Sequence, residues 1–279
     1  MENGTLQFTK MHGLGNDFMV VDNLSGEVLL GADRIKALAD RYTGVGFDQL
    51  LVIEKPTTAE AEFDYRIYNA DGSEVEHCGN GARCFARYVT DKGLTSSARI
   101  NVNTIGGQLT LILNDNELVT VQMGVPDFNP ANIPFKASEE SPYYAIEVNN
   151  TTIDVGAVAI GNPHVVLQVN DTDTAQVETL GPLLELHERF PKRVNVGFMQ
   201  LIDRGNIRLR VFERGVGETL ACGSGACAAV AIGIRQGLLD KTVNVSLSGG
   251  PLKIVWEESN KSIEMTGACS TVFEGQTRM

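Results

Sequence analysis

The chain has 279 residues, 43% hydrophobic and 21% charged, which is typical of a globular protein with one large domain or two of ordinary size. Its net charge of −12 argues against nucleic acid and anionic membranes as partners, because both bind through basic surfaces. No apolar stretch is long enough to span a bilayer, and the first residues lack a signal-peptide pattern, so we expect a cytoplasmic protein.

Short segments of alternating apolar and polar residues, bounded by glycine or asparagine, predict strands along most of the first half. The expected elements are strands at 7–11 and 18–22, a helix at 32–41, strands at 50–54 and 63–69, a helix after Cys78, and strands at 99–103, 108–113 and 118–123. Arg83 and Arg87 lie off the apolar face of the helix after Cys78, and Gly93 is its predicted stop.

The second half has the same character. The expected elements are strands at 153–160, 164–169, 195–202 and 207–212, a helix after Cys222, and strands at 243–247, 252–256 and 262–266. Residues 226–234 are apolar on nearly every side, which predicts that this helix is buried, and Gly237 is its predicted stop.

One pattern occurs twice along the chain. Residues 65–82 (YRIYN, then Glu74, then CGNGA from Cys78) have counterparts 144 positions later in LRVFE, Glu218 and CGSGA from Cys222. Gly15-Asn16 returns as Gly161-Asn162 with a shift of 146, and residues 46–50 resemble residues 197–201 with a shift of 151. Ordered repeats of this kind indicate two similar lobes.

We therefore predict an α+β fold of two pseudo-symmetric lobes, each a curved, mostly antiparallel sheet or barrel around a central helix. The N-terminal lobe spans residues 1–124 and carries Cys78, and the C-terminal lobe spans residues 125–266 and carries Cys222. Residues 267–279 are expected to return to the N-terminal lobe. The active site is then expected in the cleft between the lobes, with one thiol on each side.

Each of these two cysteines stands directly before a glycine-rich helix start, where backbone N–H groups are unpaired and the helix dipole is positive. This position predicts that the pKa of each thiol falls below the usual value of about 8.5. The same N–H groups can hold a substrate carboxylate, because glycine lets the backbone approach a ligand. The candidates for this carboxylate cradle are Gly79, Asn80, Gly223 and Ser224.

A thiolate and a thiol on opposite sides of a stereocentre suffice to invert it, one as general base and the other as general acid. Nothing in the sequence indicates pyridoxal phosphate, so no cofactor is expected. The cysteine spacings and scattered histidines do not fit a zinc site, so no metal is expected either. The remaining cysteines, Cys84, Cys227 and Cys269, are interpreted as structural.

These motifs resemble those of the diaminopimelate epimerase family over essentially the whole chain. Residues 10–18 (KMHGLGNDF) are similar to the opening signature of that family, and residues 69–83 are similar to its first cysteine motif. Residues 161–164 (GNPH) and 213–225 resemble the motifs of its second half. Long motifs in this order are far more specific than a single Cys-Gly-x-Gly.

The resemblance implies a cofactor-independent isomerase that converts LL- to meso-diaminopimelate in the synthesis of lysine and peptidoglycan precursors. It implies that Cys78 and Cys222 are the acid–base pair and that His164 and Glu213 tune their pKa values. It also implies a homodimer, with Phe273 at a dimerisation position where tyrosine is common. The implied substrate-binding residues are Asn16, Gln49, Asn69, Gly79, Asn80, Asn162, Asn195, Glu213, Arg214, Gly223 and Ser224.

Other functions remain open at this point. A proline or hydroxyproline racemase, or a related dehydratase, shares the two-cysteine plan, although a substrate with one carboxylate needs fewer polar groups than Asn69, Asn195 and Arg214 offer. A redox sensor would use Cys78 and Cys222 as a switchable disulfide. A catalytically silent relative would only bind a metabolite.

Overall fold

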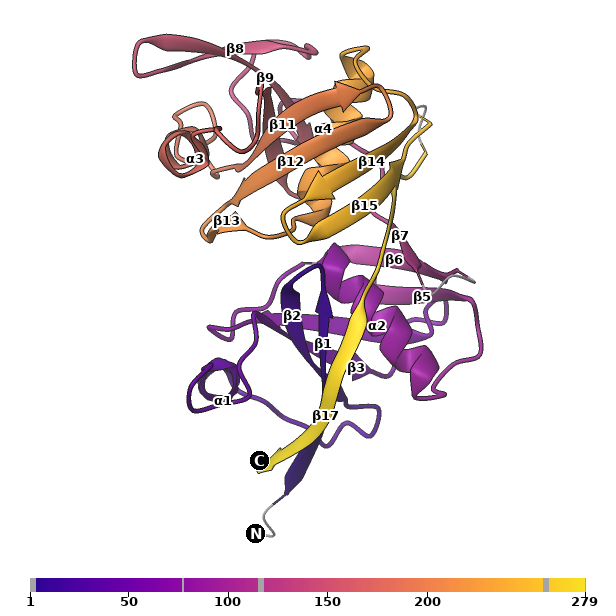
Figure 1. Ribbon diagram of the computed structural model, residues 1–279. Helices are drawn as coiled ribbons and strands as arrows, with labels where there is room; N and C mark the ends of the chain where they lie inside the picture. Colours follow the sequence, from indigo (N-terminus) through magenta and orange to yellow (C-terminus); the bar gives the residue numbers. More distant parts are fainter. Residues whose placement is uncertain (1–3, 77, 115–117, 258–260, 279) are drawn as a thin grey trace. The chain divides into compact units, whose positions relative to one another are not determined.

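The computed structural model describes residues 4–76, 78–114, 118–257 and 261–278 (Figure 1). It divides into two compact units, residues 1–121 with 267–279 and residues 122–266, where the sequence suggested divisions at 124 and 266. The chain passes between the units within β7 (Val119–Gln122) and β16 (Glu264–Gly267). None of the helices in the described part of the chain is long and apolar enough to cross a membrane.

The first unit is a mixed, mostly antiparallel sheet whose strands β1, β2, β3 and β6 pack against helix α2 (Gly79–Asp91). Strand β1 lies antiparallel to both β17 and β2, while β2 pairs in parallel with β3 and β4 in parallel with β5. The short helix α1 (Ala32–Ala39) buries Ile35 and Leu38 in a hydrophobic cluster with residues of β2 and β3. The strands are β1 (Thr5–Gly13), β2 (Asn16–Asp22), β3 (Gln49–Glu54), β4 (Phe63–Asn69), β5 (Arg99–Thr104), β6 (Gly107–Leu113) and β17 (Ser270–Arg278).

The second unit has the same plan around helix α4 (Gly223–Arg235), which packs on β9, β10, β11 and β15 and is buried along almost its whole length. Helix α3 (Val177–Glu185) packs against β11 and β12. The other strands are β8 (Tyr144–Val148), β9 (Thr151–Ala159), β10 (Pro163–Gln168), β11 (Asn195–Asp203), β12 (Asn206–Glu213), β13 (Gly217–Thr219), β14 (Thr242–Leu247) and β15 (Gly250–Val255).

The sequence repeat is a repeat of topology. Along β1 to β6, successive strands pair antiparallel, parallel, antiparallel, parallel and antiparallel, and the series β9, β10, β11, β12, β14, β15 pairs in the same order. The parallel registers also agree, because Phe18 opposes Gln49 and His164 opposes Asn195, a shift of 146 for both members. The two-lobe α+β prediction is therefore confirmed.

One predicted correspondence between the two halves of the chain is wrong. The register pairs Val20 with Leu51 and Val166 with Gly197, so the equivalent of Gly197 is Leu51 and not Gly46. Gly46 lies in the loop before β3, whereas Gly197 lies inside β11. The resemblance of residues 46–50 to 197–201 is a coincidence of composition.

Both cysteine-bearing helices end in the same motif. Gly93 and Gly237 follow the last residues with φ values of 68° and 74°, a conformation that glycine adopts without strain. The N–H of Leu94 donates to Val89 O and that of Leu238 donates to Gly233 O, the long bonds of Schellman caps. The predicted stops of both helices are confirmed.

Four elements were absent from the predictions: β8, β13, β17 and α3. Strand β13 has only three residues, and α3 contains Gly181-Pro182, which normally interrupts a helix. A Cβ at Gly181 would lie 2.7 Å from the Phe212 ring, so contact with β12 requires glycine there. Helix α1 ends at Ala39 and not at Arg41, because the Asp40 carboxylate accepts the N–H groups that follow.

Candidate active site

In the first unit, Cys78 is the N-cap of α2 and brings three polar side chains together. Its Sγ accepts the N–H of Gly81 at 3.5 Å and lies 3.7 Å from Asn16 Oδ1 on β2. The Asn80 amide donates to the same Asn16 oxygen at 3.4 Å. Asn16 also donates to Asp48 Oδ2 at 3.0 Å, which fixes the orientation of its amide. The structure thus groups the predicted residues Asn16, Cys78 and Asn80.

Gln49 and Asn69 oppose each other on the paired strands β3 and β4. Gln49 Nε2 donates to Asn69 Oδ1 at 3.0 Å, and Asn69 Nδ2 donates to Ser73 Oγ at 3.2 Å. Gln49 Oε1 is buried and has no hydrogen-bond donor among the residues that the structure describes. A buried acceptor without a partner is costly, so this oxygen is suited to a donor group of a ligand.

The first turn of α2 is held by a completely buried arginine. Arg83 donates to Gly79 O at 3.4 Å, to Asn80 Oδ1 at 3.0 Å and, from Nε, to Ala268 O at 3.2 Å. The sequence placed Arg83 off the apolar face and missed this role, because helical periodicity does not reveal that the returning C-terminal segment covers that side. Arg83 fixes both predicted cradle residues of this unit.

Glycine in this turn also serves packing. A Cβ at Gly81 would lie 2.3 Å from the hydroxyl oxygen of the buried Tyr65, so no larger residue fits without displacing that ring. The hydroxyl of Tyr65 donates to Cys78 O at 3.5 Å. Gly81 therefore allows the helix start to lie directly on β4.

In the second unit, Cys222 is the N-cap of α4 and is only 4% exposed. Burial raises the pKa of its thiol well above the ordinary value, and the negative charge of Glu213 raises the pKa further. The N–H of Gly225 and the hydroxyl of Ser224, whose Oγ lies 3.7 Å from Sγ, lower the pKa by less. The expectation of a lowered pKa is thus wrong for Cys222, because desolvation outweighs the helix start, and the thiol is protonated at neutral pH.

Asn162, His164 and Asn195 lie at the start of β10 and β11. His164 is 1% exposed, and its Nε2 lies 2.8 Å from Asn162 Oδ1. Asn195 is also buried; it donates to Pro163 O at 2.8 Å and accepts the Arg214 N–H at 3.0 Å. Asn195 therefore braces two strand ends with hydrogen bonds inside the protein.

Glu213 and Arg214 follow each other at the end of β12 but have different surroundings. Glu213 Oε1 accepts the hydroxyl of Thr219 at 2.5 Å and faces the Cys222 thiol closely enough to affect its pKa. Arg214 is exposed, and its guanidinium donates to Lys192 O at 3.3 Å. The arginine keeps further N–H groups that could bind a carboxylate.

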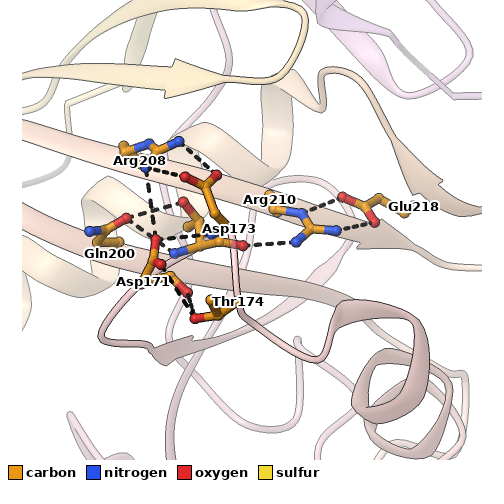
Figure 2. Close-up of polar contacts among 8 residues, drawn as sticks. Asp171, Asp173, Thr174, Gln200, Arg208, Arg210 and Glu218 are labelled. Carbon is orange, nitrogen blue, oxygen red and sulfur yellow. Dashed lines mark hydrogen bonds and ion pairs between the residues drawn. The ribbon is translucent and has the colours of Figure 1, made fainter.

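An arginine–glutamate clamp precedes each cysteine. In the second unit, the Arg210 guanidinium donates to both carboxylate oxygens of Glu218, at 2.6 and 2.7 Å (Figure 2). In the first unit, Arg66 binds both oxygens of Glu74 in the same way. Backbone pairing of Tyr68 with Glu74 and of Phe212 with Glu218 adds to both clamps. Each glutamate lies four residues before its cysteine, so the clamps anchor the two cysteine loops at equivalent points.

Figure 2 also shows a second ion pair on the same strand. Arg208, two residues before Arg210 on β12, donates to both oxygens of Asp173 at 2.8 and 3.0 Å. Asp173 belongs to the loop that precedes α3 and not to the loop that leads to Cys222. Arg210 also donates to Thr172 O of the loop before α3 at 2.8 Å, so the Arg208–Asp173 pair is a control for the bond between Arg210 and Glu218.

Comparison with known proteins identifies the family of the chain and solved structures with a similar fold. A family model described as diaminopimelate epimerase matches residues 8–129 and 156–272, and the matched ranges include both cysteine motifs. A hydroxyproline epimerase from Agrobacterium vitis with bound trans-4-OH-L-proline is 15% identical, with a TM-score of 0.71 over 99% of this chain and 93% of that chain.

Two other solved structures have a similar fold. A probable proline racemase from Agrobacterium radiobacter is 15% identical, with a TM-score of 0.69 over 98% of this chain and 92% of that chain. A phenazine biosynthesis protein of the PhzF family from Bacillus anthracis is 17% identical, with a TM-score of 0.68 over 98% of this chain and 99% of that chain. At these identities the likeness extends to the fold alone.

Proposed function

Because the chain belongs to the diaminopimelate epimerase family, and is thus an enzyme of the epimerase and isomerase type, we propose that it interconverts LL- and meso-diaminopimelate without a cofactor. The observation that carries the proposal is the repeated position of Cys78 and Cys222. Each is the N-cap of a 13-residue helix that starts Gly-x-Gly, at a constant shift of 144 residues. The reaction would belong to lysine and peptidoglycan precursor synthesis in the cytoplasm.

In the proposed reaction, one cysteine thiolate removes the α-proton and the other cysteine thiol delivers a proton to the opposite face of the same carbon. After one turnover the thiolate has become a thiol and the thiol has become a thiolate. In the reverse reaction the two cysteines exchange their roles. The buried, neutral Cys222 thiol suits the role of acid, with Cys78 as the matching base. No protein group other than the two thiols then needs to gain or lose a proton.

The negative charge that develops on the substrate carboxylate would be stabilised by backbone N–H groups at the helix starts. Gly79 and Asn80 would supply them in the first unit, and Gly223 and Ser224 in the second. Arg83 supports this role, because its hydrogen bonds to Gly79 O and Asn80 Oδ1 fix the first turn of α2 before any ligand binds.

Diaminopimelate carries two amino-acid heads, and the polar groups around the cysteines can serve both. The unpartnered Gln49 Oε1 is an acceptor for an ammonium group, and the exposed Arg214 guanidinium is a donor for the distal carboxylate. Asn16, Asn69, Asn162 and Asn195 offer neutral amides, which can bind either charge. The single carboxylate and the ring of proline would leave part of this set unused.

The proposal is tested by incubating the pure, reduced protein with LL-diaminopimelate in deuterium oxide and following loss of the α-proton by NMR. We expect deuterium incorporation together with formation of the meso isomer. Cys78→Ser and Cys222→Ser should each lower both by about a thousandfold or more, since each removes one proton carrier. Cys227→Ala removes a buried thiol of α4 that has no proposed catalytic role, and this variant should stay active.

Proline and trans-4-hydroxyproline serve as control substrates. Exchange on either of them without exchange on diaminopimelate would indicate a proline or hydroxyproline racemase. Absence of exchange on all three, from folded and reduced protein, would contradict the proposed activity altogether.

A further inference from the structure

A second pair of thiols lies in the first unit and takes no part in the proposed reaction. Cys84 lies within α2 and is completely buried, whereas Cys269, just before β17, is partly exposed. Cys269 Sγ donates to the carbonyl oxygen of Arg83, the residue before Cys84, at 3.3 Å, and each thiol influences the pKa of the other. Two cysteines that the sequence assigned to separate structural roles are thus direct neighbours.

The surroundings of the two thiols differ in a way that matters for oxidation. The hydrogen bond from Cys84 and the charges of Arg83 and Arg87 lower the pKa of Cys269 despite its burial. Burial raises the pKa of Cys84, which therefore stays protonated. A partly exposed thiol with a lowered pKa beside two guanidinium groups has the features of a peroxide-sensitive cysteine, and Cys84 is the neighbouring thiol that can resolve its oxidised form after losing its proton.

We propose that Cys269 and Cys84 form a peroxide-sensitive disulfide site, in which peroxide attacks Cys269 and Cys84 resolves the product. In the first step the Cys269 sulfur displaces hydroxide from hydrogen peroxide, its thiol proton leaves in water, and a sulfenic acid forms. In the second step the Cys84 sulfur attacks that sulfenic sulfur, and its proton leaves with the hydroxyl group as a second water. One peroxide molecule is reduced, and two thiols become one disulfide.

Arg83 connects this site to the first turn of α2. Its guanidinium binds Ala268 O, next to Cys269, and also Gly79 O and Asn80 Oδ1, while its own carbonyl accepts the Cys269 thiol. A bond between Cys84 and Cys269 would therefore fix the segment at residues 268–269 against the helix whose first turn carries Cys78. The bridge should stabilise this unit, because it constrains the unfolded chain.

The test uses the full chain with Cys78→Ser and Cys222→Ser, which removes the thiols of the proposed reaction and leaves Cys84, Cys227 and Cys269. Treatment of the folded protein with hydrogen peroxide should cause the loss of two hydrogen atoms in intact mass. Peptide mapping should find Cys84 joined to Cys269. The melting temperature should rise by about 5 °C and fall back after reduction with a thiol.

Variants in that background separate the two roles. Adding Cys269→Ser should abolish the bridge, and adding Cys84→Ser should leave a Cys269 sulfenic acid that dimedone traps. Adding Cys227→Ala should leave the bridge intact. A Cys269 that stays reduced, a Cys269 oxidised to sulfinic acid without a bridge, a bridge to Cys227, or a melting temperature that does not rise would each overturn the proposal. These outcomes do not depend on turnover, so they are distinct from a failure of the epimerase proposal.

Discussion

Cys222 illustrates how burial and a helix start compete at a single residue. The N-cap position offers a hydrogen bond to the sulfur, but removal of water from a group that is 4% exposed favours the neutral thiol, and Glu213 adds a like charge beside the thiolate. A carboxylate near the sulfur therefore sets how readily the cysteine ionises.

Glu213→Gln should increase the reactivity of Cys222. The substitution removes one cause that raises the pKa of the thiol, so the thiolate fraction at any pH below that pKa increases. Alkylation of Cys222 by iodoacetamide in a Cys78→Ser background should become about fivefold faster at pH 8, and its pH profile should move to lower pH. Glu188→Gln, an exposed position in the same unit, is the control, and a slower reaction in Glu213→Gln would contradict the assigned influence of Glu213.

At the scale of elements, the repeated unit is a strand, a clamped loop and a helix. The strand carries the arginine, the segment after the strand carries the glutamate, and the cysteine caps the helix, so three local features fix one sulfur. Exposed ion pairs contribute little to stability, typically less than about 1 kcal/mol. A clamp that is only partly buried is therefore better explained by positioning of the loop than by stability.

Arg210→Gln and Glu218→Gln should each lower kcat for exchange on diaminopimelate by about tenfold with a smaller change in KM, because a sulfur displaced by a fraction of an ångström loses alignment with the α-carbon. The double variant Arg210→Glu with Glu218→Arg should recover part of the loss. Arg208→Gln breaks the neighbouring pair with Asp173 and should change kcat less than twofold. An equal loss in Arg208→Gln, with equal melting temperatures, would contradict a specific role for the clamp.

At the scale of the whole molecule, the C-terminal strand closes the first unit. Strand β17 pairs along its length with β1. Phe273 on this strand is 47% exposed and contacts Phe8 edge to face, and the adjacent Val272 is also exposed. Exposed apolar side chains side by side on one strand suit contact with a second copy of the chain.

We propose that the protein is a homodimer and that Phe273→Asp makes it monomeric, because a charge would be buried without a partner in the interface. Light scattering coupled to size exclusion at micromolar concentration measures this directly. Phe273→Tyr should remain dimeric, since it keeps the ring. Tyr42→Asp, at a position that is 97% exposed elsewhere in the same unit, is the charge control. A Phe273→Asp protein with unchanged mass would exclude the strand as the interface.

The sequence by itself determined most of the elements, the two-lobe repeat, both helix stops and the position of each cysteine before a helix. These features are local, because the alternation of apolar and polar residues, turn glycines and motif spacing act over a few residues. The repeat adds to this, since a pattern found in one lobe supports the interpretation of the same pattern in the other. The same local signals failed where they were ambiguous, at the Gly181-Pro182 dipeptide of α3 and at the chance likeness of residues 46–50 to 197–201.

Only the tertiary structure decided what surrounds those positions. The raised pKa of Cys222, the burial of Arg83, the pairing of β17 with β1 and the contact of Cys84 with Cys269 all depend on segments far apart in the chain. Burial and charge proximity are properties of the folded neighbourhood and not of spacing along the sequence. The sequence therefore predicted the reacting residues, while the fold sets the protonation of Cys222 and brings the second thiol pair together.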